Sequence, residues 1–158
     1  MNYRQLNELP VKNKFPMPLI EELIDELHGA RYFTKIDLTA GHFQIRVKVE
    51  DIPKTAFRTH QRLYEFKVMP VGLTNAPATF QSLMNQFFQE QMRKCVLVFF
   101  DDILIYSPSL EMHVKHVTEV LRILRQHQLY AKMSKCSFAQ LQVEYLGYII
   151  SAKGVQAN

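Results

Sequence analysis

The sequence predicts an α+β fold, in which an antiparallel sheet packs against helices. Short apolar runs rich in β-branched and aromatic residues, each beside a turn signal, predict paired strands. Helical patterns fall between these runs, without the regular strand–helix alternation of a parallel sheet. With 158 residues, of which 47% are hydrophobic and 22% charged, the chain is expected to form one globular domain.

Composition narrows the class of protein. A net charge of +4 permits a polyanionic partner without requiring one. Cys95 and Cys136 are far apart in sequence, which argues against a cysteine metal site or a disulfide framework and fits a reducing compartment. The polar start, MNYRQLNELP, lacks a signal-peptide core, and the apolar runs are too short to span a membrane. We therefore expect an intracellular protein without a membrane partner.

The first expected element is a helix that Pro18 opens and Gly29 closes, after extended chain over residues 1–17. Its apolar residues recur at i, i+3, i+4 and i+7, so one face is expected to pack against the core. That face carries Ile20, Leu23, Ile24 and Leu27. The opposite face is acidic, and its helical spacing indicates a solvated face rather than a metal cluster. It carries Glu21, Glu22, Asp25 and Glu26.

Two strands are expected next. The first runs from Tyr32 to Leu38 and contains one acid, Asp37. A break at Thr39-Ala40-Gly41 separates it from a second strand, His42 to Val49. An acid at a strand end, followed by small residues, can place a carboxylate beside exposed backbone N–H groups, which suits a metal-bound phosphate. An ordinary turn aspartate is the alternative.

A hairpin is expected from Thr55 to Thr59 and Leu63 to Val68, around His60-Gln61-Arg62. Basic residues alternate with aromatic ones along it, as in segments that track a nucleic-acid backbone. The basic residues are Lys54, Arg58, His60, Arg62 and Lys67, and the aromatic ones are Phe57, Tyr64 and Phe66. Any half-buried strand also alternates, so both interpretations stay open.

Two longer helices follow. The first begins after the loop that starts at Met69, with Asn75 as its cap and Pro77 in its first turn. Its apolar stripe is expected in the core, and comprises Phe80, Leu83, Met84, Phe87 and Phe88. The second runs from Glu111 to His127, with Val114, Val117, Leu121 and Leu124 facing inward. His113 and His116 are interpreted as a surface pair, because no third metal ligand has suitable spacing.

The segment Val96 to Tyr106 predicts a hairpin with Asp101 and Asp102 at its turn. Two adjacent buried carboxylates would be costly, and their repulsion would raise at least one pKa. Bound Mg²⁺ would remove both costs, whereas a solvated turn is the simpler interpretation of the turn alone. In an antiparallel sheet, Asp37 can lie at the end of a strand that neighbours this hairpin.

The chain continues with a basic segment, Ala131 to Phe138, and a final hairpin over Val143 to Ile150.

In their order and spacing, these motifs resemble the fingers–palm part of the reverse transcriptases of gypsy-type LTR retrotransposons. The resemblance runs nearly end to end. It is carried by YRQLN, VKNKFPMPLIEELIDEL, ARYFTKIDL, KTAFRTH, YEFKVMPVGLTNAPATFQSLMN, VLVFFDDILIYS and EYLGYIIS. It implies a polymerase palm with partial fingers over residues 1–158, ending after the primer-grip-like hairpin, with the thumb and ribonuclease H outside the chain.

The resemblance also implies an activity and a metal site. The activity is that of an RNA-directed DNA polymerase, a nucleotidyltransferase that extends a primer 3′ end by two-metal phosphoryl transfer. Asp37, Asp101 and Asp102 match the catalytic acids, which would bind two Mg²⁺ ions, or Mn²⁺, with the Leu38 carbonyl as a further ligand. Lys135 falls near a lysine that is a candidate proton donor to pyrophosphate.

Further positions match the family's substrate contacts. The residues expected at the nucleotide are Ala40, Gly41, His42, Val71 and Gln81. The residues expected at the primer are Leu146, Gly147 and Tyr148. One departure concerns the segment GHFQI, where His42 stands at the place of the family's aromatic gate against ribonucleotides, and Phe43 follows. Adjacent strand residues point to opposite faces, so Phe43 cannot simply substitute for the gate.

The partners implied are an RNA or DNA template with its primer, deoxynucleoside triphosphates, and the thumb, ribonuclease H and integrase of a polyprotein. The implied location is the cytoplasm, within virus-like particles, or the nucleus. Two alternatives remain at this point. A catalytically silent fragment of a degenerate retroelement is favoured by GHFQI, whereas the three intact acids favour a working enzyme. A nucleotide cyclase is the third hypothesis, and the final hairpin argues against it.

Overall fold

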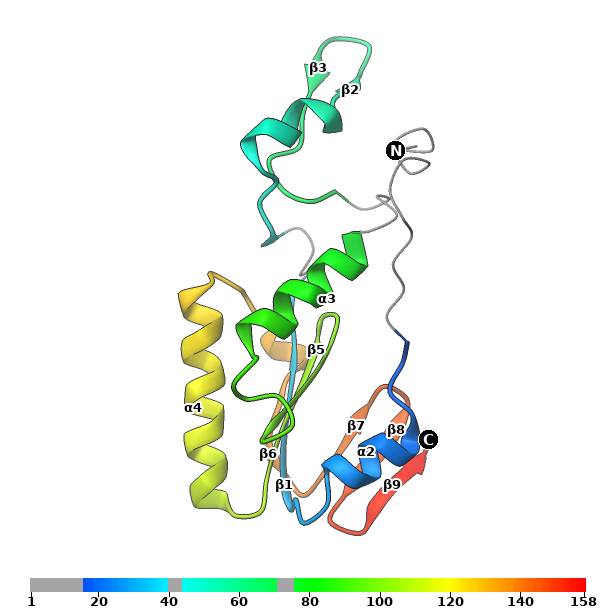
Figure 1. Cartoon of the computed structure of the whole chain (residues 1–158), viewed down its shortest axis with the longest axis vertical. Coiled ribbons are helices and arrows are strands. Elements are labelled where there is room, and N and C mark those ends of the chain that lie inside the picture. The colour runs from blue at the N-terminus through cyan, green and yellow to red at the C-terminus, as the bar shows by residue number, and fades with distance from the viewer. Residues whose placement is uncertain (1–15, 40–43, 71–75) are drawn as a thin grey trace.

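A computed structural model describes residues 16–39, 44–70 and 76–158 of the chain, and the α+β fold class is confirmed (Figure 1). The helices are α2 (Ile20–Glu26), α3 (Ala76–Phe87) and α4 (Leu110–Gln126), with the short 3-10 helices η2 (Val49–Thr55) and η3 (Met133–Lys135). The strands are β1 (Tyr32–Asp37), β2 (Phe57–Arg58), β3 (Leu63–Tyr64), β4 (Val96–Phe99), β5 (Asp102–Ser107), β6 (Ser137–Gln140), β7 (Gln142–Tyr145), β8 (Tyr148–Ser151) and β9 (Gly154–Ala157).

The central sheet has the strand order β4-β5-β1-β6, and the pairs within it are antiparallel. Strand β1 pairs with β5 along its whole length, from Tyr32 opposite Ser107 to Asp37 opposite Asp102. Strands β1 and β5 are therefore the inner pair, and their shared end carries two acids.

No helix in the described part of the chain is long and apolar enough to cross a membrane.

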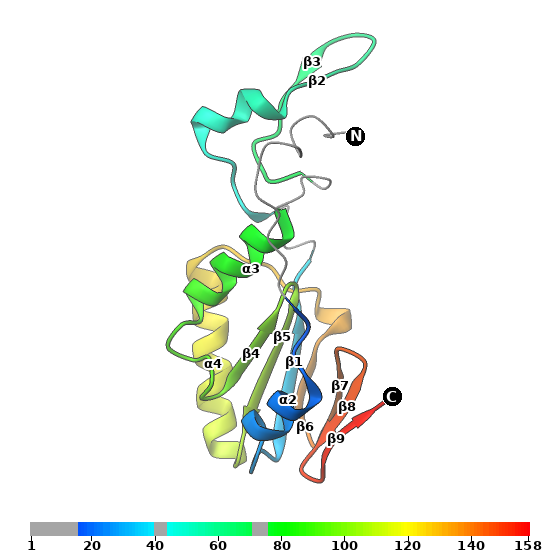
Figure 2. The ribbon, with the colours of Figure 1, turned by 45° about the vertical axis from the view of Figure 1, so that its right-hand side comes forward.

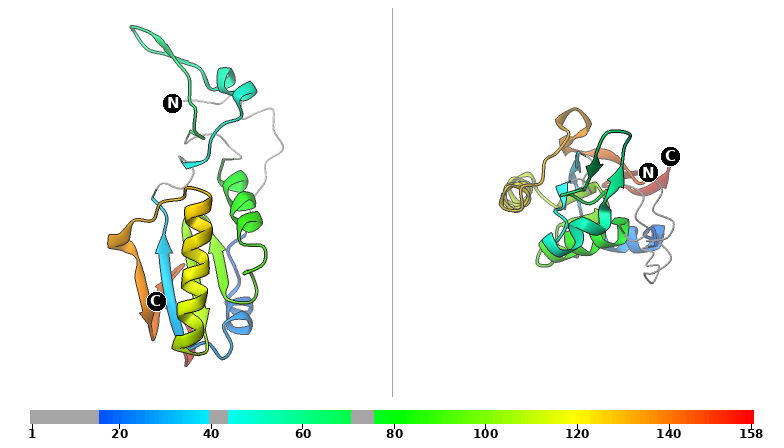
Figure 3. Two further views of the ribbon diagram at one scale, coloured as in Figure 1. Left: turned by 90° about the vertical axis from the view of Figure 1, so that its left-hand side faces the viewer. Right: turned by 90° about the horizontal axis from the view of Figure 1, so that it is seen from above.

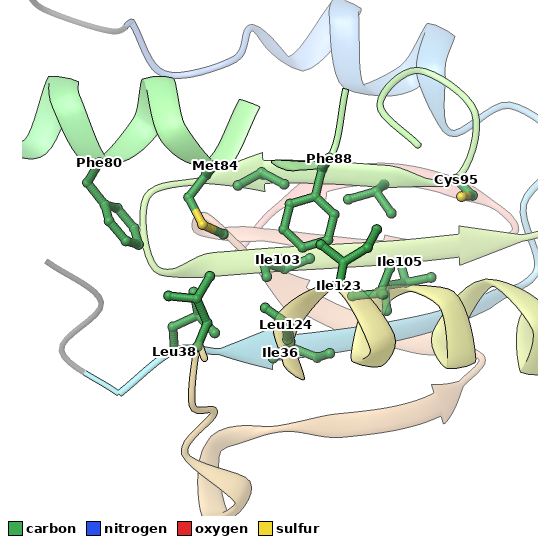
Figure 4. Packing of buried hydrophobic residues seen from close by; sticks show 14 of the residues in the cluster. Ile36, Leu38, Phe80, Met84, Phe88, Cys95, Ile103, Ile105, Ile123 and Leu124 are labelled. Atoms are coloured by element: carbon green, nitrogen blue, oxygen red, sulfur yellow. The ribbon is translucent and has the colours of Figure 1, made fainter. Parts of the chain in front are cut away.

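Helices α3 and α4 cover one face of this sheet (Figure 3). Alternate strand residues supply the apolar surface beneath them, as the two-residue period of a strand requires. Figure 4 shows side chains from both helices pointing toward the sheet residues between them. The cluster includes Ile36 and Leu38 from the first strand, Ile103 and Ile105 from β5, Phe80, Met84 and Phe88 from α3 and its end, and Val120, Ile123 and Leu124 from α4.

Helix α2 and a second antiparallel sheet, β7-β8-β9, cover the opposite face (Figure 2). The other set of alternate residues, Phe33, Leu104 and Tyr106, packs there. The Tyr106 hydroxyl donates to Glu26 Oε1 at 2.9 Å, which ties α2 to the sheet. The central sheet is therefore covered by apolar packing on both faces. A ligand that binds Asp37 and Asp102 would approach along the ends of their strands.

The hairpin β2–β3 and η2 lie beyond the end of α3, away from the central sheet (Figure 1). Phe57 pairs with Tyr64 and Arg58 with Leu63, so the predicted hairpin is confirmed, although each strand has only two residues. The turn between them is closed locally, because Thr59 Oγ1 accepts from the Arg62 backbone N–H at 3.1 Å.

The predicted second strand, His42 to Val49, is wrong over its described residues. Arg46 forms only an isolated bridge with Val68, and η2 begins at Val49. Val49 is 84% exposed, so its side chain would gain no burial from an extended strand. Instead the Asp51 N–H donates to the Lys48 carbonyl at 2.8 Å and starts the 3-10 turn.

The ends and faces of two helices also differ from the prediction. Helix α2 begins at Ile20 rather than at Pro18, and Ile24 on its expected apolar face is exposed. Helix α4 buries a face rotated from the predicted one, so Val114 and Leu121 are exposed. Leu124 is buried as predicted, and the residues buried with it are His113, Val120 and Ile123.

A buried polar network explains the rotation of α4. His113 is not on the surface, because its Nε2 lies 2.7 Å from Thr34 Oγ1 and its Nδ1 lies 2.8 Å from Ser107 Oγ. Ser107 Oγ also lies 2.7 Å from His116 Nδ1. A buried imidazole with two partners is satisfied, so this polar residue can take a core position. The predicted surface pair of histidines is therefore wrong.

The final hairpin is confirmed, with its turn at Leu146-Gly147. Both residues have positive φ, 51° and 80°, which matches the primed turns that join twisted antiparallel strands. Glycine accepts such a φ without strain, which accounts for Gly147 at the second position. A further strand, β9, pairs with β8 beyond the predicted end of the hairpin at Ile150.

Candidate active site

The strand ends of β1 and β5 bring two acids together. Asp37 and Asp102 are direct partners in the antiparallel register, and the Leu38 N–H donates to the Asp101 carbonyl at 2.8 Å. Directly opposed residues of an antiparallel pair project from the same face of the sheet. The predicted meeting of Asp37 with the two-acid hairpin is therefore confirmed for the backbone.

The two acids of the hairpin have different local structures. Strand β4 ends at Phe99 and β5 begins at Asp102, so the turn consists of Phe100 and Asp101. Phe100 has φ of 49°, a left-handed conformation that is uncommon for a bulky residue. Asp102 thus belongs to a strand rather than to the predicted turn, whereas Asp101 projects from a turn that needs outside support.

Two lysines face the paired acids. Lys35 Nζ lies 3.7 Å from Asp102 Oδ1, and Lys135 Nζ lies 3.6 Å from Asp37 Oδ2. Lys35 precedes Asp37 by two residues on β1, which puts both on one face. Lys135 is brought in by η3, which follows a hydrogen bond from the Lys132 N–H to the Asp37 carbonyl at 2.8 Å. Lys135 therefore lies beside the first acid, and its role as a proton donor to pyrophosphate stays a prediction.

The pKa of Asp102 is raised above its ordinary value. Burial is the largest cause, the negative charge of Asp37 adds to it, and Lys35 and Lys135 act in the opposite direction. Removal of water penalises the charged carboxylate, and a like charge nearby does the same. A cation at this strand end would favour the charged form, so the site is electrostatically suited to binding one.

The residues suit a magnesium ion in chemistry, although they do not form a complete cage. Carboxylate and carbonyl oxygens are the ligands that Mg²⁺ prefers, and this strand end supplies them. Within the described residues, however, no group of three or more His, Cys, Asp or Glu side chains is arranged to hold a metal ion. The predicted three-acid cluster is therefore present in the backbone arrangement but not as a formed set of ligands. Leu38, whose carbonyl is a predicted ligand, forms an isolated bridge with Ala131.

Gln81, a predicted nucleotide contact, is 3% exposed and lies under the hairpin turn. Its Nε2 donates to the Val98 carbonyl at 3.0 Å and to Asn85 Oδ1 at 2.8 Å. Its Oε1 accepts from the Phe100 N–H at 2.6 Å. Both amide hydrogens are therefore used within the protein, and the side chain supports the turn that carries Asp101.

Tyr145 connects the final hairpin to the acidic strand. Its hydroxyl donates to the Asp102 carbonyl at 3.3 Å, and its ring is buried. Burial raises the pKa of Tyr145, as do the negative charges of Asp102 and Glu26. The hairpin turn Leu146-Gly147, with Tyr148 after it, is therefore anchored beside the acids.

Lys35 and Tyr145 contact the acidic strand ends but were not predicted as site residues. The signal for Lys35 is its two-residue spacing from Asp37 on an expected strand, which places both side chains on one face. No sequence signal indicates the Tyr145 contact, because it depends on how the second sheet packs. Four predicted nucleotide-site residues, Ala40, Gly41, His42 and Val71, lie outside the described residues.

Similarity to known proteins agrees with this geometry. A sequence model of the family described as reverse transcriptase (RNA-dependent DNA polymerase) matches residues 1–150. The chain is 39% identical over its full length to the retrovirus-related Pol polyprotein from transposon opus of Drosophila melanogaster, and covers 16% of that polyprotein. It is 42% identical over 154 residues to the transposon Tf2-3 polyprotein of Schizosaccharomyces pombe, which is 98% of this chain and 12% of that polyprotein.

Solved structures share the fold. The foamy viral protease-reverse transcriptase in complex with an RNA/DNA hybrid matches with a TM-score of 0.85 and 22% identity, over 99% of this chain and 21% of that one. The same protein in complex with double-stranded DNA matches with a TM-score of 0.83 and 21% identity, over 99% of this chain and 33% of that one. The gypsy subtype remains a prediction, but with the family model matching residues 1–150, the chain belongs to the reverse transcriptase family.

Proposed function

We propose that this chain is the catalytic core of an RNA-directed DNA polymerase within a retrotransposon polyprotein, and that it extends a primer 3′ end with deoxynucleotides. The observation that carries the proposal is the pairing of Asp37 with Asp102 at one end of the central sheet, next to Asp101. Membership of the reverse transcriptase family supports it, because the family generally uses divalent metal ions. The fold favours a nucleotide cyclase no more than it favours a polymerase, and membership of the reverse transcriptase family argues against a cyclase.

The three acids would hold two Mg²⁺ ions, or Mn²⁺, with the Leu38 carbonyl as a further ligand. When bound, such ions would lower the pKa of the primer 3′-hydroxyl and offset the charge that develops on the leaving pyrophosphate. The chain itself contributes a site in which Asp102 is half-buried and its carboxylate is held by Lys35. Lys35 therefore restrains Asp102 and limits the repulsion between it and Asp37.

Lys135 would act on the leaving group. Its Nζ lies 3.6 Å from Asp37 Oδ2, and its side chain is 58% exposed. That combination leaves the ammonium beside the acids yet open to a ligand that arrives from solvent. An ammonium so placed can donate a proton to pyrophosphate as it leaves, which makes Lys135 a candidate general acid.

Nucleic acid would be held through its backbone and shape rather than read by sequence. The hairpin turn Leu146-Gly147, with Tyr148, would support the primer end. The exposed β2–β3 hairpin carries Arg58, His60 and Arg62, which suit template phosphates. Deoxynucleoside triphosphates would meet Ala40, Gly41, His42 and Val71. The thumb, ribonuclease H and integrase of the same polyprotein would be its partner domains. The polymerase would work inside the cell, in virus-like particles or in the nucleus.

A second candidate is a silent copy, which folds but does not polymerise. Two observations favour it: the described acids form no complete metal cage, and His42 stands where the family has an aromatic residue. This candidate predicts a folded chain that binds neither metal nor nucleotide productively. It differs from the first candidate in activity, not in fold.

Primer extension separates the two candidates. In the full polymerase, with its thumb, we expect the protein to add deoxynucleotides to a primer on an RNA template with Mg²⁺. Asp101→Asn should then lower the rate by on the order of 10²–10³, the scale for losing one electrostatic stabiliser of a transition state. Duplex binding should change little. The matched control is Asp25→Asn on the exposed face of α2, which should leave the rate unchanged. A wild-type full polymerase that folds and binds duplex but adds no nucleotide with either Mg²⁺ or Mn²⁺ would favour the silent copy.

A further inference from the structure

Gln81 makes an unusual set of contacts for a helix residue that faces a core. Its three hydrogen bonds join α3 to two backbone groups of the β4–β5 hairpin and to Asn85 on its own helix. The two backbone groups, the Val98 carbonyl and the Phe100 N–H, flank Phe99 directly before Asp101. The amide therefore spans the end of β4 where the chain turns toward the acids.

The orientation of the Gln81 amide follows from its partners. The Phe100 N–H can only donate and the Val98 carbonyl can only accept, so the amide oxygen must face the first and the nitrogen the second. Asn85 Oδ1 takes the remaining amide hydrogen at 2.8 Å. The side chain is thus held in one orientation by three partners. An apolar residue of similar size would fill the same space but would leave both hairpin groups unpaired.

The turn benefits from this support because Phe100, a bulky residue at the first position of a two-residue hairpin turn, has a left-handed φ of 49°. Such a conformation costs energy in a bulky residue and persists only where surrounding contacts impose it. The bond from the Phe100 N–H to Gln81 Oε1, at 2.6 Å, is a contact of that kind. It acts on the residue that directly precedes Asp101, so it sets the direction in which the Asp101 carboxylate leaves the turn.

We propose that Gln81 is a positioning residue that fixes the Phe100 turn and thereby holds the Asp101 carboxylate where it can bind a divalent cation. Gln81 touches neither nucleotide nor metal in this role. This positioning role takes the place of the predicted contact between Gln81 and the nucleotide. The metal half of the inference rests on the proposed function, whereas the turn half rests on the hydrogen bonds alone.

The test uses the 158-residue chain and three variants. Gln81→Leu removes the clamp, and Asp101→Asn removes the carboxylate itself. Gln86→Leu is the matched control, because it makes the same change at an exposed position on the same helix. Two quantities are measured for each protein: the hydrogen-exchange protection of the Phe100 amide relative to that of Leu104, and the affinity for Mn²⁺ from the free-ion signal in electron paramagnetic resonance.

We expect Gln81→Leu to lower the relative protection of the Phe100 amide by at least about tenfold, since a half-buried donor loses its partner. Mn²⁺ affinity should fall by about tenfold, as when an outer-shell partner of a metal site is removed. Gln86→Leu should match the wild type in both. If the wild type binds Mn²⁺ and Gln81→Leu binds it equally well, the positioning role is overturned. If the wild type binds no Mn²⁺, the proposed metal site fails, and the Phe100 protection alone decides whether Gln81 fixes the turn: equal protection in Gln81→Leu and the wild type would overturn that role.

Gln81→Glu covers the case in which Gln81→Leu does not fold. A protonated glutamate can accept from the Phe100 N–H and donate to the Val98 carbonyl, whereas a carboxylate can only accept. Burial raises the pKa of such a carboxyl above its unfolded value of about 4.3. The variant should therefore gain stability relative to the wild type as pH falls from 7 to 5, and protection of the Phe100 amide should return with it. No change of the stability difference with pH would contradict the clamp.

Discussion

The β4–β5 and β2–β3 hairpins are both tight and antiparallel, yet they differ in what holds them. The β4–β5 turn is supported from α3 by Gln81 and from the second sheet by Tyr145. Strand β5 is buried on both faces, and β4 is buried on one. The β2–β3 turn is closed by Thr59 within its own four residues, and Leu63 is 66% exposed. Contacts from other elements therefore distinguish the two hairpins. The β4–β5 hairpin can hold its acids in a fixed arrangement, whereas the β2–β3 hairpin is suited to a mobile, negatively charged ligand such as a nucleic-acid strand.

The largest expected effect on this comparison is on stability. Ile105 on β5 is fully buried, so Ile105→Ala should lower the free energy of unfolding by about 2–5 kcal/mol. Leu63→Ala on β3 deletes as large a side chain from a largely exposed position and should cost less than about 0.5 kcal/mol. Urea unfolding of both variants measures the difference. Equal losses would show that the two hairpins are supported to the same degree.

A smaller effect is expected from the tyrosine that anchors the final hairpin. Tyr145→Phe removes the hydroxyl that donates to the Asp102 carbonyl, and should cost about 1 kcal/mol because the partner is half-buried. Tyr64→Phe is the control on β3, where the ring stacks on Phe57 with centroids 5.7 Å apart and keeps that contact. Denaturant unfolding compares the two. A larger loss for Tyr64→Phe would contradict the assigned roles.

The smallest expected effect is a pH dependence from the buried network on α4. Burial lowers the pKa of both His113 and His116, so the fold favours their neutral forms. The unfolded chain then binds more protons below about pH 6.5, and stability should fall by about 1 kcal/mol as pH drops from 7 to 5. His113→Gln should flatten this dependence, whereas His60→Gln on the exposed hairpin should not. A wild-type stability that is constant over this range would refute the assignment.

Local patterns predicted what local physics decides. The β1 and β5 strands, the turn at Gly147 and the adjacency of Asp37 to the two-acid hairpin follow from short apolar runs rich in β-branched and aromatic residues and from turn chemistry. The buried face of α4 does not, because His113 is buried only once Thr34 and Ser107 are brought to it by the sheet.

Long-range contacts account for the rest of what the sequence could not predict. The strand expected up to Val49 stops short, because Ile45 packs against the core whereas Val49 is 84% exposed. The support of the active turn by Gln81 and Tyr145 joins residues 19 and 43 positions apart, and no spacing rule connects such pairs. The catalytic roles proposed for the acids rest on family resemblance, and the structure adds the contacts around Asp37 and Asp102.

Paramagnetic broadening by Mn²⁺ tests the central claim most directly. Backbone amide signals of the ¹⁵N-labelled chain would be followed while Mn²⁺ is added in substoichiometric steps. If the strand end that carries Asp37 and Asp102 is the metal site, the amides of Asp37, Leu38 and Asp102 should disappear first, while those of Gln61 and Arg62 on the β2–β3 turn persist. Broadening that begins at the exposed acids of α2, or that spares Asp102, would contradict the account.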